Sequence, residues 1–188
     1  MEIDIRDRRH ELVLSHDPPA NSDVLTLSAF LDLWMEKPDS GSSPSGLLAI
    51  NVKSDGLAER LAREIHPRLY EEHSFFCFDM SFPQQRQYSL QGLPIASRIS
   101  EYEPVDRLPA TGWRSGDRVW LDCFETDWFL GSREITAMCL SSPVSIVSPE
   151  IHGRDPRFVW DWVASIDECS REISVCTDRP EELNEWLT

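Results

Sequence analysis

The chain has 188 residues and a mass of 21.6 kDa, which suits one domain better than two complete ones. Its 18 basic and 33 acidic residues give a formal charge of −15, which disfavours attraction to nucleic-acid phosphates or anionic lipid headgroups. Hydrophobic residues make up 40% and aromatic residues 10% of the chain, too many for a disordered protein. Composition therefore indicates a folded, soluble protein that does not bind nucleic acid.

The cysteines and the N-terminus indicate the compartment. None of the five cysteines belongs to a C-x-x-C pair, so reduced thiols are expected instead of a zinc site or a disulfide framework. No apolar run approaches the length of a membrane span, and the first residues are charged where an export signal is apolar. We therefore expect a cytoplasmic protein without a membrane span.

Short apolar runs alternate with stretches of helical spacing, a pattern that predicts an α/β fold in a single domain over residues 1–188. The predicted strands are Glu2–Arg6, Leu12–Ser15, Leu47–Val52, Ser74–Phe78, Ile95–Ile99, Val119–Phe124, Val144–Ser148 and Ile173–Cys176. The second of these can instead be a hairpin arm, which leaves seven strands for a barrel. The predicted helices are Thr26–Glu36, Gly56–Ile65, Ser132–Leu140, Pro156–Ile166 and Pro180–Trp186.

The first predicted strand carries its acidic residues on one face. Period-two alternation places Glu2 and Asp4 on one side and Ile3 and Ile5 on the other. Two carboxylates at this spacing form half of a site for a hard cation, because Mg²⁺ and Ca²⁺ prefer oxygen ligands. Alternating charge on the exposed side of an edge strand gives the same pattern, so both interpretations stay open.

A histidine and an aspartate follow the second predicted strand, directly before two prolines. The imidazole of His16 can give or take a proton near neutral pH, and the adjacent Asp17 carboxylate can orient it. The same residues also suit a turn that Asp17 initiates, with His16 only solvated.

The third predicted strand is apolar until Asn51 and Lys53, which point to one face. A lysine at the end of a buried strand suits a point-charge contact to a phosphate oxygen. Alternatively, the Lys53 ammonium simply reaches solvent from the strand end.

Together, E-I-D, H-D and the strand ending in Asn-x-Lys resemble the glycerophosphodiester phosphodiesterase and phosphatidylinositol-specific phospholipase C superfamily, whose members are phosphodiester-cleaving TIM barrels. The resemblance implies that Glu2 and Asp4 bind a divalent cation, Mg²⁺ or Ca²⁺, with Asn51 at a further ligand position. It also implies that His16 is the general acid or base and that Lys53 contacts phosphate. The implied substrate is a small glycerol- or inositol-type phosphodiester, and the implied fold is a TIM (β/α)8-type barrel.

Two departures from the family pattern affect these expectations. The family's opening strand, with its H-R-G motif and second catalytic histidine, has no counterpart before Glu2, and Asn51 stands where a carboxylate is expected. A barrel of this type needs about 250 residues and eight strands. We therefore expect a barrel that lacks its first strand, with an N-terminal segment lost upstream.

An alternative function is that of a catalytically silent relative that binds a phosphorylated ligand or a protein partner. Polar residues also follow several later strands, at positions that line the active mouth of a barrel. Asp79, Glu101, Asp122 and His152 are among them, but His152 cannot be assumed to replace the missing histidine.

Overall fold

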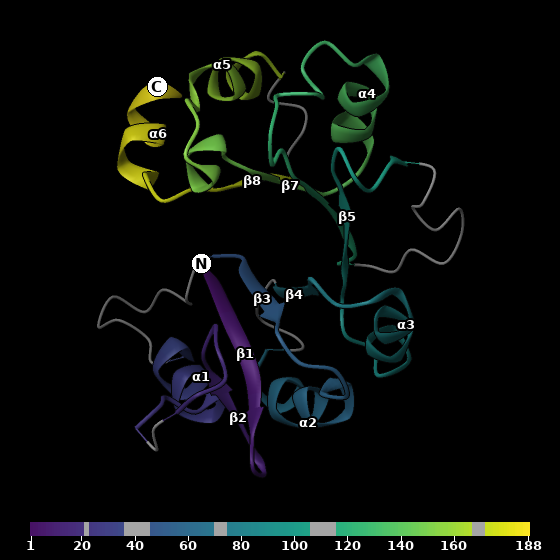
Figure 1. Cartoon of the computed structure of the whole chain (residues 1–188), viewed down its shortest axis with the longest axis vertical. Helices are drawn as coiled ribbons and strands as arrows, with labels where there is room; N and C mark the ends of the chain where they lie inside the picture. Colours follow the sequence, from purple (N-terminus) through teal and green to yellow (C-terminus); the bar gives the residue numbers. More distant parts are fainter. Residues whose placement is uncertain (21–22, 36–45, 70–74, 106–115, 167–171) are drawn as a thin grey trace. The chain divides into compact units, whose positions relative to one another are not determined.

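The structure is a computed structural model that describes residues 1–20, 23–35, 46–69, 75–105, 116–166 and 172–188 (Figure 1). The described chain divides into two compact units, which we describe separately. Unit 1 comprises residues 1–96 with 116–117, and unit 2 comprises residues 97–105, 118–166 and 172–188. None of the helices in these ranges is long and apolar enough to cross a bilayer.

Unit 1 is a mixed sheet with helices packed on one face. Its elements are β1 (Glu2–Arg8), β2 (Glu11–Leu14), α1 (Leu27–Met35), β3 (Leu48–Val52), α2 (Ala58–Leu69), β4 (Phe75–Phe78) and α3 (Phe82–Leu90). The strand order is β2-β1-β3-β4, in which β2 is antiparallel to β1 and the other pairs are parallel. Figure 1 shows α1 and α2 beside β1 and β2.

Alternation along β1 directs its isoleucines into a core and its acidic residues to the other face of the sheet. Ile3, Ile5 and Ile50 point into a core that they share with residues of α1 and α2, such as Leu31 and Leu61. Each of these fully buried aliphatic side chains contributes about 1.5–3 kcal/mol relative to an exposed one. The opposite face carries the alternate residues of β1 and β3, and it is there that the predicted site residues lie.

Unit 2 has a fully parallel sheet. Its elements are β5 (Ala96–Ile99, of which the first residue belongs to unit 1), β6 (Arg118–Leu121), α4 (Arg133–Ser141), β7 (Val144–Val147), the 3-10 helix Pro149–His152, α5 (Arg157–Ser165), β8 (Ile173–Cys176) and α6 (Pro180–Trp186). The strand order is β5-β6-β7-β8. Its separate core contains the buried residues Val119, Leu121, Ile146 and Phe129. Ser132 caps α4 by accepting a hydrogen bond from the Ile135 backbone N–H at 3.3 Å.

The prediction of a TIM barrel without its first strand is wrong. The described strands form two four-stranded sheets, one mixed and one parallel. The second predicted strand is indeed a hairpin arm, and as β2 it pairs with one edge of β1 while β3 pairs with the other. Because both edges of β1 are occupied, β8 cannot pair with β1 to close the sheet, as an eight-stranded barrel would require.

The remaining differences concern element boundaries and one helix. The predicted helices all exist with ends shifted by up to four residues, as Gly56–Ile65 against Ala58–Leu69 illustrates. The sequence pattern does not predict helix α3, because Tyr88 is its only buried residue and no apolar stripe marks it. The proline-, glycine- and serine-rich stretch 38–46 predicts a surface loop, and the sequence pattern assigns no element to 103–117; most of both ranges lies outside the described residues.

Candidate functional site

Four of the predicted site residues gather at the face of the sheet opposite the core that is shared with α1 and α2. Parallel pairing sets Asp4 of β1 opposite Asn51 of β3, and Lys53 follows the end of β3. The backbone N–H of Lys53 donates to the Ile5 carbonyl at 3.0 Å, which fixes where the lysine side chain starts. Residues almost fifty positions apart in the sequence therefore lie side by side because their strands are neighbours.

Lys53 lies between two carboxylates. Its Nζ is 3.5 Å from Asp4 Oδ1 and 3.4 Å from Asp79 Oδ2. Only 17% of the Lys53 side chain is exposed, so these contacts are partly shielded from solvent. We call Glu2, Asp4, Asn51, Lys53 and Asp79 the acid–lysine cluster.

Asp79 belongs to this cluster, although the family resemblance assigns it no role. It follows β4 and adopts a positive φ of 67°, a conformation that is uncommon for residues other than glycine, asparagine and aspartate. With this backbone conformation, the Asp79 carboxylate lies within ion-pair distance of the Lys53 ammonium. The only signal of it in the sequence is a polar residue directly after an apolar strand.

Asn51 lies close to Glu2, and its amide lowers the pKa of the Glu2 carboxyl. Asn51 is 9% exposed, and its Oδ1 is buried without a hydrogen-bond partner among the described residues. Partial burial and the neighbouring Asp4 charge raise the pKa of Glu2, against the lowering effects of Asn51 and Lys53.

His16 lies at the exposed rim of the cluster. Its side chain is 69% exposed, and Nδ1 is 3.0 Å from Asp17 Oδ1. The backbone carbonyl of His16 accepts a hydrogen bond from Arg6 Nε at 2.7 Å, which ties this turn to β1. The backbone N–H of Ser15 donates to the Asp4 carbonyl at 3.0 Å, so the turn that carries His16 lies beside β1. The structure thus places Glu2, Asp4, Asn51 and Lys53 side by side, with His16 on the adjoining turn.

The acid–lysine cluster offers oxygen donors that suit a divalent cation, although these donors bring few charges. Glu2 and Asp4 supply carboxylates, and the orphaned Asn51 Oδ1 is the kind of neutral oxygen that Mg²⁺ or Ca²⁺ accepts. No group of three or more histidine, cysteine or acidic residues suited to a metal ion occurs in the described part of the chain. A cation bound here would therefore depend on Asn51 and on solvent for its remaining ligands.

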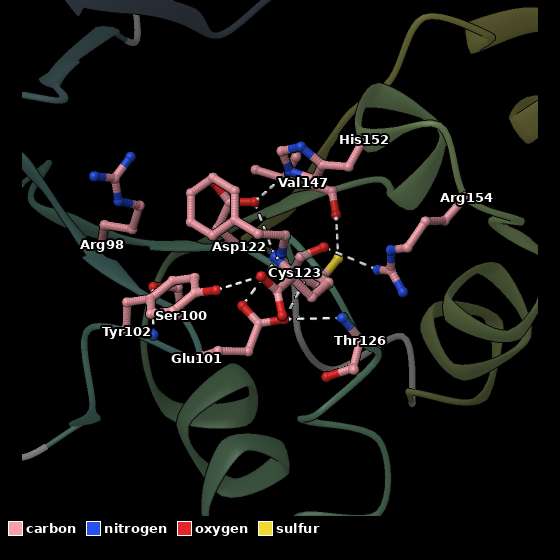
Figure 2. Close-up of polar contacts among 12 residues, drawn as sticks. Arg98, Ser100, Glu101, Tyr102, Asp122, Cys123, Thr126, Val147, His152 and Arg154 are labelled. Carbon is pink, nitrogen blue, oxygen red and sulfur yellow. Dashed lines mark hydrogen bonds and ion pairs between the residues drawn. The ribbon is translucent and has the colours of Figure 1, made fainter.

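A second group of polar residues lies where the parallel strands of unit 2 end. His152 Nε2 is 2.8 Å from Asp122 Oδ1, and Figure 2 marks this contact with a dashed line. Asp122 follows β6 and is 4% exposed, and His152 ends the 3-10 helix after β7. The Phe124 ring packs on the His152 imidazole with 4.9 Å between their centres. We call Asp122 and His152 the carboxylate–imidazole pair.

The loop after β6 is held by Glu101, which follows β5. Its carboxylate accepts hydrogen bonds from the backbone N–H groups of Phe124, Glu125 and Thr126 at 3.0–3.2 Å (Figure 2). Partial burial opposes ionisation of Glu101, but these backbone donors outweigh it and lower its pKa. The carboxylate therefore fixes the backbone that carries Phe124.

Comparison of the chain with protein-family models, with curated proteins and with solved structures found no significant match. Conclusions about function therefore rest on the sites themselves.

Proposed function

We propose that the acid–lysine cluster binds a phosphodiester and that the protein hydrolyses it. The observation that supports this proposal most directly is the convergence of Asp4, Asn51 and Lys53 on one face of adjacent strands. The E-I-D, H-D and Asn-x-Lys segments independently favour phosphodiester chemistry. The resemblance that these segments carry favours a small substrate of the glycerol or inositol type.

Lys53 and His16 have complementary roles in this proposal. The Lys53 ammonium binds a nonbridging oxygen and stabilises the charge that develops there. His16 accepts a proton from the attacking water molecule, whose oxygen forms the new bond to phosphorus. The bond to the leaving alcohol breaks, and the alcohol takes up the proton. Exposure of His16 leaves its ring accessible to such a substrate.

A bound Mg²⁺ or Ca²⁺ would neutralise charge on the phosphate. Glu2, Asp4 and Asn51 are the residues that would hold it. The buried Asn51 oxygen, which has no partner among the described residues, supports this assignment.

The second candidate function is binding of a phosphorylated ligand without turnover. It is favoured by the contacts of Lys53, because Asp4 and Asp79 already compensate its charge and a phosphate would have to compete with them. The replacement of a charged metal ligand by Asn51 favours it too, since a neutral oxygen lowers affinity for the cation.

The test is hydrolysis of bis(4-nitrophenyl) phosphate by the full chain, with and without added Mg²⁺ or Ca²⁺. We expect His16→Ala to lower the rate by about a hundredfold, and Lys53→Met to lower it by a similar factor, about a hundredfold. His10→Ala and Arg63→Met are the matched controls, because these residues are exposed and lie outside the cluster. Both controls should keep the rate of the unmodified protein.

The two candidate functions predict different results. Hydrolysis that His16→Ala and Lys53→Met each lower by about a hundredfold supports the enzyme. No hydrolysis, together with Lys53-dependent binding of the diester in calorimetry, supports the silent binding protein. Hydrolysis that His16→Ala leaves unchanged would refute the acid–base role of His16.

The partner and the location complete the proposal. The partner is a small phosphodiester, and the location is the cytoplasm. Fractionation of cells with an antibody against the protein tests the location.

A further inference from the structure

We propose that the carboxylate–imidazole pair of unit 2 is a second site, in which His152 activates a water molecule for hydrolysis of an ester. The residues of this site are separate from the acid–lysine cluster, and the inference does not depend on the function proposed for that cluster. It rests on the tautomer of His152, on the free edge of its ring, on the way the ring is held and on its place in the sheet.

The tautomer follows from the contact with Asp122. An ionised carboxylate can only accept a hydrogen bond, so the 2.8 Å contact requires the proton of neutral His152 to be on Nε2. Nδ1 then carries the lone pair. Asp122 is fixed in turn, because its Oδ1 also accepts from the Cys123 backbone N–H at 2.8 Å. Asp122 thus has the orienting role that a carboxylate has beside a catalytic histidine.

The other edge of the His152 ring is available to a ligand. Nδ1 has no hydrogen-bond partner in the ranges that the structure describes, and 21% of the side chain is exposed. A histidine that served only to satisfy the buried Asp122 carboxylate would not require an accessible Nδ1. The combination of a fixed tautomer and an accessible lone pair is what a general base requires.

Packing holds the imidazole in place. The Phe124 ring lies against one side of it, and Arg98 lies over the same Phe124 ring with its guanidinium carbon 5.5 Å from the ring centre. The backbone that carries Phe124 is held by Glu101, whose carboxylate accepts a hydrogen bond from the Phe124 N–H at 3.2 Å. A general base that is held by such contacts loses little conformational entropy when it takes up the geometry of the reaction.

The position in the fold is that of a ligand site. Glu101, Asp122 and His152 follow β5, β6 and β7, three adjacent strands of a parallel sheet. In open parallel sheets, ligands bind at the carboxyl ends of the strands. Two other carboxylates near the pair are already engaged. Backbone N–H groups donate to Glu101, and Arg154 donates to Asp127.

The reaction begins when water loses a proton to His152 Nδ1 and its oxygen forms a bond to the carbonyl carbon of the ester. The bond from that carbon to the alkoxide then breaks, and the imidazolium returns its proton to the leaving alkoxide. The products are a carboxylic acid and an alcohol, and His152 is regenerated.

The first experiment measures the tautomer by two-dimensional ¹H–¹⁵N NMR of the histidine rings. We expect the unmodified protein to carry the His152 proton on Nε2. Asp122→Asn should keep the proton on Nε2, because the Oδ1 that accepts from the Cys123 N–H also accepts from Nε2, but it should move the Nε2 proton signal upfield, since an amide is a weaker acceptor than a carboxylate. Asp127→Asn is the matched control and should leave the Nε2 proton signal where it is in the unmodified protein. An Nδ1 proton in the unmodified protein would overturn the proposal.

The second experiment follows the hydrolysis of ethyl dichloroacetate, a neutral ester probe, near neutral pH. We expect His152→Gln to lower the protein-catalysed rate by about tenfold. Gln keeps a donor for Asp122, and an unchanged circular dichroism spectrum and melting temperature would show that the fold is intact. His10→Gln, which removes an exposed histidine without a carboxylate partner in the described residues, should have little effect.

The solvent isotope effect tests whether the rate depends on proton transfer from water. Transfer of a proton from water should make the reaction roughly twofold slower in D₂O. Equal losses for His152→Gln and His10→Gln, or no isotope effect, would refute water activation by His152. Neither result bears on the phosphodiester assay, so the two proposals fail separately.

Discussion

At the scale of single residues, Glu2 carries a carboxyl group whose ionisation the fold opposes. Partial burial and the charge of Asp4 raise its pKa above the ordinary value of 4.5. A carboxyl whose pKa is raised by folding stabilises the folded state below its unfolded pKa, and this contribution is lost as the pH rises through the folded pKa. At neutral pH the charged Glu2 carboxylate therefore makes the folded protein less stable than a neutral side chain at this position would.

Glu2→Gln should consequently raise the melting temperature near neutral pH, and the difference should disappear on acidification to about pH 4. Differential scanning calorimetry across this pH range measures it. Glu11→Gln is the matched control, because Glu11 is exposed and forms no side-chain hydrogen bond in the described part of the chain. A Glu2→Gln variant that is less stable at neutral pH would contradict the expectation.

At the scale of elements, Glu101 ties the end of β5 to the loop that follows β6. Its pKa is lowered by backbone donors that outweigh its partial burial. A group whose pKa is depressed by folding adds stability above its unfolded pKa, which is lost as the pH falls through the folded pKa. The loop should therefore loosen on acidification.

Glu101→Gln should lower the free energy of unfolding by about 1 kcal/mol near neutral pH, because a neutral amide is a weaker acceptor than a carboxylate. The loss should shrink as the pH approaches about 4. Urea unfolding gives the free energy, and hydrogen exchange at Phe124, Glu125 and Thr126 shows whether the loop opens. A loss equal to that of Glu11→Gln would mean that the carboxylate contributes nothing there.

At the scale of the whole molecule, the net charge of −15 acts against compactness. Raising NaCl from about 0.01 M to about 0.3 M screens repulsion between exposed carboxylates and should raise the melting temperature at neutral pH. The same addition close to the isoelectric point of about 4.6 should have little effect, because the net charge is then near zero. A lower melting temperature in salt at neutral pH would show that favourable ion pairs outweigh the repulsion.

Local patterns in the sequence determined most of the elements. Alternation in β1 placed Glu2 and Asp4 on the face opposite Ile3 and Ile5, and the burial of the two isoleucines agrees. Apolar spacing identified α1, α2, α4 and α5, each of which has an apolar stripe to bury. Helix α3 lacks such a stripe, so only the structure reveals it.

Tertiary structure alone decided how the strands pair. Pairing depends on edges that meet over long distances in the chain, and the antiparallel β2 takes the edge of β1 that a barrel would need for closure. The contact of Asp79 with Lys53 and the contact of Asp122 with His152 are of the same kind, because each joins residues from the ends of different strands. The sequence shows which residue types end those strands, whereas only the packed sheets bring particular pairs together.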